Sequence, residues 1–264
     1  MRNEVNGAGD LLRHWRGVRG RSQLDLSLDS GVSQRHISFV ESGRSVPSRQ
    51  MLLDLAQALE VPLRDRNAML LAAGYAPVYS EAPWNAEEMS SVTRALERML
   101  AHHEPFPALV MDRDWTVLKT NRAAPRFFGR FTDLEAFPPP RNMLRLMFDS
   151  AGLRPCIADW PIVAEAMLQR LRRETAGAQA LLDELLAYPG VNPAWRTPKA
   201  IDLASPSPVI PLGFILHGQV LRYFSLVTTV GTPNAATAQE LRLESMVPAD
   251  DETEAAHRAL FGNS

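Results

Sequence analysis

Apolar residues recur at helical spacing through the first 75 residues, and this pattern predicts five short helices. The first of these helices places Leu12 and Trp15 on one face. The second follows a serine and is expected to bury Leu24, Leu26 and Leu28 in part. The first part of the chain is therefore predicted to be all-α.

Glycine and serine mark the ends of these helices. Gly20, Gly31 and Gly43 follow the first three helices, where a glycine C-terminal to the last turn is favoured. Ser22 and Ser33 precede the second and third helices and are suited to accept hydrogen bonds from their first amides. The chain therefore contains two helices joined by a tight glycine turn.

A change of pattern divides the chain near residue 80. Residues 75–87 carry Pro77 and Pro83 and lack clear periodicity, so we interpret them as a linker. The predicted domains are residues 1–79 and residues 80–264.

The second domain mixes helices and strands. A helix over 87–103 precedes a hairpin over 108–121, in which two apolar runs flank Asp112, Arg113 and Asp114. β-Branched and aromatic residues on both sides of His217-Gly218 predict a second hairpin over 208–231. Further helices are expected over 122–131, 141–150, 160–177, 178–188 and 250–261. The fold class is thus an all-α five-helix domain followed by an α+β domain.

The distribution of charge is more informative than the net charge of −2. Residues 1–79 hold 10 Arg against 8 Asp and Glu, a net of +2, and the remainder holds 18 Lys and Arg against 22 Asp and Glu, a net of −4. Seven arginines fall within residues 13–49. A local cluster of positive charge can bind the phosphates of DNA, although an ordinary solvated helical surface would show the same excess of arginine.

Other features of composition limit the class of protein. No run approaches the roughly 20 apolar residues that span a bilayer, and the first ten residues lack the apolar core of a signal peptide. Cys156 is the single cysteine, which excludes a disulfide scaffold. We therefore expect a cytoplasmic protein that does not associate with membranes.

Residues 22–41 have the pattern of a helix-turn-helix that reads DNA. The third helix turns Ile37 and Val40 inward, while Gln34, Arg35 and Ser38 can point outward. Glutamine pairs with adenine and arginine with guanine in the major groove, so these side chains are the candidates for base contacts. The full set of expected DNA-contacting residues is Arg21, Gln23, Ser33, Gln34, Arg35, His36, Ser38, Arg44 and Arg49.

The stretch SQLDLSLDSGVSQRHISFVESGRSVPSRQMLLDLAQALEVP resembles the xenobiotic-response-element (XRE) family of bacterial helix-turn-helix domains, which includes phage Cro-type repressors. The matching features are Gln23, the turn Gly31–Ser33, Ile37, Glu41 and Gly43-Arg44 ahead of a Pro-Ser-opened helix. Family members commonly have alanine where this chain has Ser27 or Leu28. The resemblance implies a lambda-repressor-like fold that binds a double-stranded DNA operator. Because helix-turn-helix proteins usually bind as two-fold dimers, we expect a homodimer with the C-terminal domain as its interface.

Motifs of the second domain, such as MDRDWTVLKTNRAAPRFFGRF and NMLRLMFDS, resemble the MmyB-like regulators, which join an XRE domain to a PAS-like ligand-binding domain. This resemblance implies a fatty acid or similar small apolar ligand and no other cofactor. The candidate ligand-binding residues are Trp115, Asn121, Phe127, Phe128, Met143, Arg145, Met147, Phe148, Phe214 and Phe224. Among the polar candidates Asn121, Arg145 and Arg222 could hold a carboxylate, because arginine binds one bidentately. The same apolar residues would also suit an ordinary core.

No motif of the chain indicates catalysis. His102, His103 and Glu104 are adjacent rather than spaced as metal ligands, and Cys156 stands alone. Phosphate-binding, hydrolase and zinc-protease motifs are missing, so we expect neither an enzyme nor a metal site. The alternative to ligand control is a C-terminal domain that only dimerises or docks a protein partner.

Overall fold

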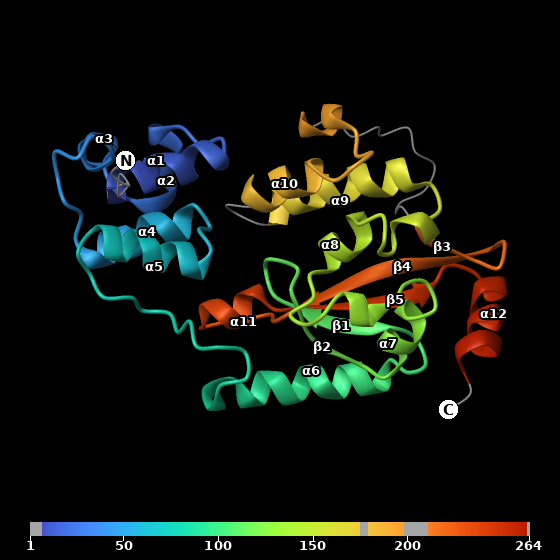
Figure 1. Cartoon of the computed structure of the whole chain (residues 1–264). Coiled ribbons are helices and arrows are strands. Elements are labelled where there is room, and N and C mark those ends of the chain that lie inside the picture. The colour runs from blue at the N-terminus through green and yellow to red at the C-terminus, as the bar shows by residue number, and fades with distance from the viewer. Residues whose placement is uncertain (1–6, 175–178, 198–210, 263–264) are drawn as a thin grey trace. The chain divides into compact units, whose positions relative to one another are not determined.

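The computed structural model describes residues 7–174, 179–197 and 211–262, which form two compact units. The N-terminal unit comprises Met1–Met89 together with Gly231–Gln239, and the C-terminal unit comprises Ser90–Val230 and Glu240–Ser264 (Figure 1). The sequence pattern instead places a boundary after Tyr79 and assigns every later residue to the second domain.

Five helices build the N-terminal unit, and the fold class predicted for it is correct. They are α1 (Ala8–Val18), α2 (Gln23–Ser30), α3 (Gln34–Glu41), α4 (Arg49–Ala58) and α5 (Leu63–Ala72). Ser22 Oγ accepts from the amide of Asp25 at 3.1 Å, and Ser33 Oγ accepts from that of His36 at 3.3 Å. Gly31 has a φ of 72°, a left-handed conformation that glycine adopts without steric cost. The chain therefore enters α3 through the turn that the sequence indicates.

Each of the first four helices contributes a fully buried side chain to the core of this unit: Leu12, Leu26, Ile37 and Leu55. One expectation for α2 is wrong: Leu26 is buried, but Leu24 and Leu28 are 53 % and 76 % exposed. Positions 24 and 28 lie on one face of the helix and position 26 on another, so burying Leu26 turns the other two outward.

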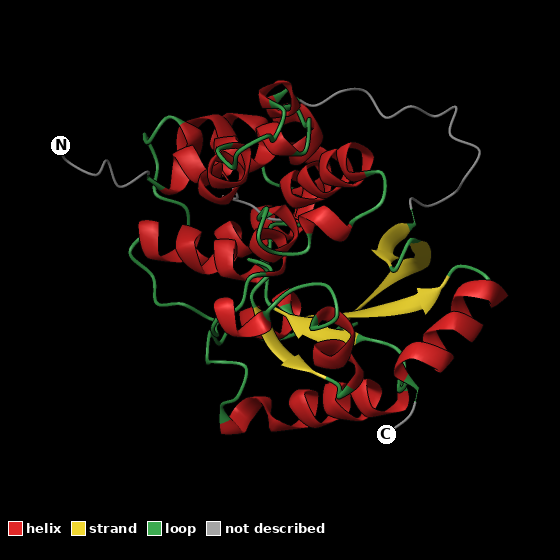
Figure 2. Cartoon of the chain, turned by 45° about the vertical axis from the view of Figure 1, so that its right-hand side comes forward, coloured by secondary structure: helices red, strands yellow, loops and turns green. Residues whose placement is uncertain are grey.

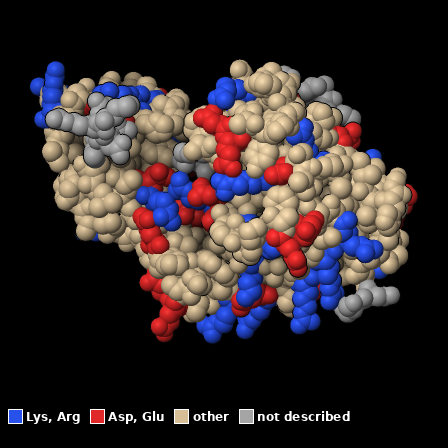
Figure 3. Space-filling model, viewed as in Figure 1, with Lys and Arg blue, Asp and Glu red and all other residues tan. Residues whose placement is uncertain are grey.

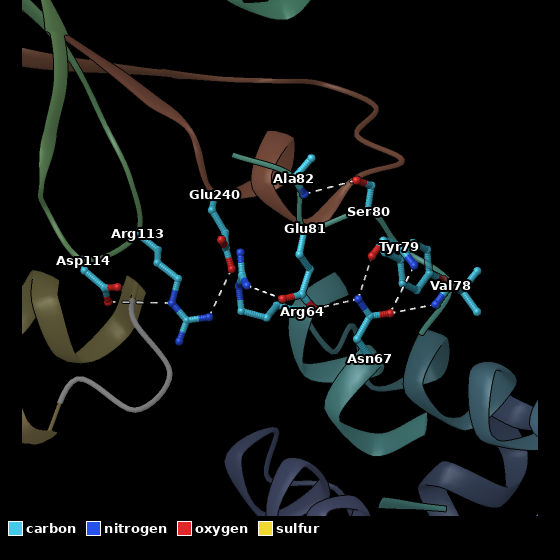
Figure 4. A network of polar contacts seen from close by, with 10 residues as sticks. All are labelled: Arg64, Asn67, Val78, Tyr79, Ser80, Glu81, Ala82, Arg113, Asp114 and Glu240. Atoms are coloured by element: carbon cyan, nitrogen blue, oxygen red, sulfur yellow. Dashed lines mark hydrogen bonds and ion pairs between the residues drawn. The ribbon is translucent and has the colours of Figure 1, made fainter. Parts of the chain in front are cut away.

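The predicted linker is fixed to α5 through Asn67, which is buried (Figure 4). The Asn67 amide nitrogen donates to the Tyr79 carbonyl at 2.7 Å and to Glu81 Oε1 at 2.8 Å. Its oxygen accepts from the amides of Val78 and Tyr79 at 3.0 and 3.1 Å. Glu81 also pairs with Arg64 of α5. Side-chain contacts, rather than helical periodicity, order this segment.

A segment from late in the chain completes the N-terminal unit. Ser80 forms a parallel bridge with Ala235, and its carbonyl accepts from the amide of Ala236 at 2.8 Å. Gln239 Oε1 accepts from the amide of Leu63 at 2.7 Å. Because the residue before Leu63 is a proline that gives no side-chain cap, Gln239 satisfies an amide in the first turn of α5.

The C-terminal unit is a five-stranded sheet with helices on both sides. Its strands are β1 (Ala108–Met111), β2 (Val117–Thr120), β3 (Leu212–Leu216), β4 (Gln219–Thr229) and β5 (Arg242–Pro248). Its α-helices are α6 (Ser90–His102), α7 (Ala123–Phe128), α8 (Met143–Phe148), α9 (Trp160–Glu174), α10 (Gln179–Leu186) and α12 (Asp251–Phe261), while α11 (Ala236–Glu240) begins in the N-terminal unit. Figure 1 places α6 on one side of the sheet and α8 to α10 on the other, and Figure 2 shows the strands of this sheet from a second direction. Mixed α and β structure is confirmed.

All neighbouring strands are antiparallel, in the order β2-β1-β5-β4-β3. Both predicted hairpins are present, although residues 208–210 of the second lie outside the described residues, as do 175–177 of the predicted helix 160–177. His217 and Gly218 form the second turn with φ values of 50° and 82°. Strand β5, which lies in the centre of the sheet, is not predicted by the sequence pattern.

Helix α12 is fixed to the sheet by His257, which is fully buried. His257 Nε2 lies 3.0 Å from the Pro105 carbonyl and Nδ1 lies 2.8 Å from the Tyr223 hydroxyl. Because a carbonyl only accepts, Nε2 carries the proton and Nδ1 accepts from Tyr223. Burial lowers the pKa of His257 and raises that of Tyr223, so both side chains stay neutral at pH 7.

Over the described residues, no helix is both long and apolar enough to cross a membrane.

Candidate nucleic-acid interface and ligand cavity

The first turn of α3 presents polar side chains to solvent. Gln34 and Arg35 are exposed, Ser38 is half-buried, and Ile37 and Val40 on the opposite side are buried. A recognition helix reads base edges with residues near its N-terminus, so this polarity is the one that major-groove contact requires. Figure 3 shows basic side chains along the upper edge of the N-terminal unit.

Local contacts orient two residues of this helix. The Arg35 guanidinium lies 5.3 Å from the ring centroid of Phe39, one turn further along. His36 Nε2 lies 3.4 Å from Ser45 Oγ, in the loop after α3. His36 is therefore in contact with that loop, whereas Arg35 stays exposed.

Glu41, at the end of α3, is the centre of a buried polar network that the sequence analysis did not predict. Its carboxylate accepts from Arg16 at 2.6 and 2.9 Å and from Gln23 Nε2 at 2.9 Å, and its carbonyl accepts from Arg13. Burial opposes ionisation of Glu41, but the hydrogen bonds from Arg16 and Gln23 outweigh it and hold the pKa of Glu41 below its ordinary value. The network joins α1, α2 and α3 around one charge.

Gln23 therefore has a different place from the one expected. Its side chain is bound to Glu41, which leaves its backbone amide, at the start of α2, as the group available to a phosphate. Arg21 lies 3.5 Å from Asp29 in an exposed ion pair. Arg44, in the loop after α3, and Arg49, the first residue of α4, are both exposed. Ser33 is exposed as the cap of α3.

A small apolar cavity lies between the sheet and the helices of the C-terminal unit. Its volume is about 60 Å³, below the several hundred Å³ of ordinary ligand sites. Five of the sequence-predicted ligand residues line it: Trp115, Phe128, Met143, Met147 and Phe214. Residues at opposite ends of the unit in sequence therefore meet at one cavity.

The structure does not bring the other predicted apolar residues to this cavity. Phe127 is buried in an aromatic cluster, with its ring centroid 5.0 Å from that of Phe214 and 5.3 Å from that of Tyr223. Phe148 is buried against Trp160 at 4.9 Å, and Phe224 is half-buried on β4. Phe127 and Phe148 therefore pack in the core, and Phe224 lies outside both the core and the cavity.

The polar candidates also lie elsewhere. Arg145 is exposed and donates to Glu184 at 2.7 and 2.9 Å, and Arg222 is exposed on β4. Asn121 is buried with its oxygen accepting from the amides of Ala108 and Ala124, and it borders an open surface depression of about 450 Å³. None of the three lines the apolar cavity.

Sequence reasoning missed the polar residues that do line it. Ser225 on β4 and Glu244 on β5 both border the cavity, and Arg170 of α9 donates to Glu244 at 3.1 Å. The only signal in the sequence is a glutamate, Glu244, within the largely apolar residues 241–247. Such a glutamate indicates an exposed position unless the segment is known to be a central strand.

Neither the single cysteine nor the candidate metal ligands form a reactive site among the described residues. The Cys156 thiol is half-buried, and burial raises its pKa, which disfavours the reactive thiolate. Within the described ranges, no group of three or more His, Cys, Asp or Glu side chains is placed to hold a metal ion.

Comparisons with known proteins agree with this division. Residues 12–65 match the family model described as "Helix-turn-helix", and residues 92–260 match that of the "MmyB-like transcription regulator ligand binding domain". Two curated relatives, each named "Transcriptional regulator ClgR" and from Mycobacterium tuberculosis strains CDC 1551 / Oshkosh and H37Rv, are 36 % identical over 66 residues. That match covers 25 % of this chain and 56 % of each relative, so the chain spans about half the length of the curated relatives it matches.

A solved structure titled "Structure of an RNA-binding Light-Oxygen-Voltage Receptor" aligns with 96 % of this chain and 62 % of that chain, with 13 % identity and a TM-score of 0.30. A structural likeness this low carries no argument about this chain. The family is shown instead by the match over residues 92–260, which follows the helix-turn-helix match over residues 12–65. The chain belongs to the family of MmyB-like transcription regulators, in which a DNA-binding helix-turn-helix is joined to a ligand-binding domain.

Proposed function

We propose that this regulator binds a specific operator through α3 and that a small apolar molecule in the C-terminal cavity controls that binding. The observation that carries the DNA half is the first turn of α3, where Gln34 and Arg35 are exposed above the buried Ile37. Selection of an operator from random double-stranded DNA with the purified chain tests it. Enrichment of no common sequence would contradict it.

For base contacts we propose Gln34, Arg35 and Ser38, and for backbone contacts Arg44, Arg49 and the amides at Ser33 and Gln23. This division follows from exposure and chemistry, because long cations bind phosphate and the bidentate groups of α3 match base edges. We place Arg21 and His36 at the border of the interface. A protein with this role works in the cytoplasm, where the DNA is.

The ligand half rests on the cavity and on the architecture around it. The strand order β2-β1-β5-β4-β3 supports the PAS-like reading of the C-terminal unit. Four methionines line the cavity, Met143, Met147, Met167 and Met246, and methionine adapts to irregular apolar ligands. We propose that these side chains move to enlarge the cavity when a ligand enters.

The connection between β4 and β5 supports a route from ligand to DNA. Ser225 on β4 and Glu244 on β5 border the cavity, while the intervening Gly231–Gln239 is part of the N-terminal unit. In α11, Gln239 binds the amide of Leu63, and the next residue, Glu240, pairs with Arg113 at 3.1 Å within the C-terminal unit. A ligand that displaces β4 and β5 therefore acts on a segment that is folded with the DNA-reading unit. It can do so only if it binds one arrangement of these strands more tightly than the other.

Replacing Gln239 by alanine is expected to reduce the effect of ligand on operator affinity by about threefold or more, while affinity without ligand changes little. The variant loses the contact to Leu63 but keeps the cavity and α3. Fluorescence anisotropy on labelled operator, with and without saturating ligand, measures both values. Thr232→Ala, an exposed change in the same segment, is the matched control. If ligand changes the operator affinity of the Gln239 variant as much as that of the parent chain, coupling through this segment is contradicted.

We propose that the regulator is a homodimer, because helix-turn-helix proteins commonly bind two half-sites about one helical turn apart. The C-terminal unit leaves apolar surface for such a contact, with Leu226 and Val227 on β4 exposed by 55 % and 41 %. Sedimentation at micromolar concentration is expected to give the mass of two chains. A single-chain mass both with and without operator would contradict the dimer.

The rival function is a C-terminal domain that dimerises or docks a protein without a ligand, and the small volume of the cavity favours it. Mass spectrometry of molecules extracted from the purified protein separates the two. A stoichiometric apolar passenger supports ligand control.

A further inference from the structure

One wall of the apolar cavity is polar. Trp115, Ser225 and Glu244 all border the cavity. Arg170 of α9 does not border it but donates a hydrogen bond to Glu244. Glu244 Oε1 accepts from Arg170 Nη1 at 3.1 Å and from the Ser225 hydroxyl. The Arg170 guanidinium lies 4.5 Å from the ring centroid of Trp115. One guanidinium thus connects the indole to the carboxylate.

The charges in this cluster cancel. The side chains of Arg170 and Glu244 are only 12 % and 14 % exposed, and they form an ion pair. A buried pair resists the loss of either partner, because the remaining charge would be uncompensated. Arg170 does not itself border the cavity, so a ligand that enters the cavity meets Glu244, whose charge Arg170 compensates.

Two polar atoms at this wall have unused hydrogen-bonding capacity. Trp115 Nε1 is a donor and Glu244 Oε2 is an acceptor, and neither has a hydrogen-bond partner among the described residues although both atoms are shielded from solvent. Buried polar groups of native proteins are nearly always paired, and an unpaired one costs about 1–3 kcal/mol. A ligand group that both accepts and donates a hydrogen bond would satisfy both atoms.

The backbone holds Trp115 in a specific position. Trp115 has a φ of 66°, which is uncommon for a bulky residue, and its side chain is 1 % exposed. Asp112 Oδ1 accepts from the amides of Asp114 and Thr116 at 2.9 Å, on both sides of Trp115. The hairpin loop thereby fixes the indole at the wall of the cavity.

We propose that the ligand's head group is an uncharged hydroxyl, which accepts from Trp115 Nε1 and donates to Glu244 Oε2, on a molecule that is otherwise apolar. A carboxylate would face the charge of Glu244 without a donor hydrogen to offer it. This inference rests on the proposed ligand function and replaces the fatty acid that the sequence suggested with an alcohol.

Two probes of equal chain length, 1-decanol and decanoate, test the head group on the purified full chain at pH 8. Isothermal titration calorimetry is expected to show decanol binding about 10-fold or more tightly than decanoate, since a hydrogen bond to a charged group is among the stronger ones. Equal binding, or tighter binding of decanoate, would overturn the proposal.

Two variants locate the preference. Glu244→Gln supplies a donor in place of the charge and is expected to raise decanoate affinity about 10-fold relative to decanol. Trp115→Phe keeps an aromatic ring but removes the N–H, and is expected to weaken decanol about fivefold. Glu97→Gln, an exposed carboxylate on α6, is the matched control. An unchanged ratio in both cavity variants, with thermal midpoints showing folded protein, would place the head group elsewhere.

The outcomes distinguish failure of the hydroxyl proposal from failure of the proposed ligand control. If decanoate binds more tightly and alters operator affinity, the ligand function stands and the hydroxyl is wrong. If neither probe binds and no apolar passenger is extracted, both the ligand function and the hydroxyl are overturned.

Discussion

Replacing Arg35 by alanine is expected to lower operator affinity about 10- to 100-fold while binding to random DNA changes little, because a bidentate arginine–guanine contact contributes about 1–3 kcal/mol of discrimination. Arg35 is exposed on the first turn of α3, and the ring of Phe39 supports its guanidinium. Titration of selected and scrambled duplexes at fixed salt measures the ratio.

Arg44→Ala is the matched control, since Arg44 is an exposed arginine just beyond α3. If it contacts phosphate, its loss weakens all sequences alike and reduces the salt slope by about one. Equal losses on both duplexes for Arg35→Ala would remove Arg35 from base readout.

Replacing Glu41 by alanine is expected to destabilise the N-terminal unit by about 2–3 kcal/mol, because Arg16 is left partly buried without its partner but retains some contact with water. Side-chain exposures of 18 % for Arg16 and 2 % for Glu41 support this order of magnitude. Hydrogen exchange of amides in α1 and α3 measures the effect in that unit alone. Asp54→Ala, an exposed carboxylate on α4, is the control.

The same network gives a pH dependence of known sign. The folded pKa of Glu41 lies below its unfolded value of about 4.3, so the stabilisation is complete above roughly pH 5 and is lost as pH falls through the lower folded pKa. Glu41→Gln should remove this acid dependence of exchange in α1 and α3. Identical pH profiles for the variant and the parent chain would show that the Glu41 charge does not matter.

The N-terminal fold could be predicted because its signals are local. Ser22, Ser33 and Gly31 act on neighbouring backbone groups, so their residue types reveal helix ends directly. The Glu41 network could not be predicted in this way, because it joins Arg16 and Gln23 from helices whose packing angles the sequence does not state.

The C-terminal unit shows the same limit more clearly. Strand β5 was missed because Arg242 and Glu244 interrupt the apolar run expected of a central strand. The cost of burying Glu244 is offset by Arg170, a partner 74 residues earlier in the chain. The segment Gly231–Gln239 joins the N-terminal unit through individual hydrogen bonds to Ser80 and Leu63. Such isolated contacts produce no periodic pattern in the sequence, so this association could not be predicted.

The central claim is that a ligand in the cavity controls operator binding, and operator affinity measured with and without saturating 1-decanol tests it most directly. Coupling between two sites is commonly about 5- to 150-fold, so the dissociation constant for the selected operator is expected to change at least fivefold. An unchanged constant, with calorimetry showing the cavity filled, would contradict the account.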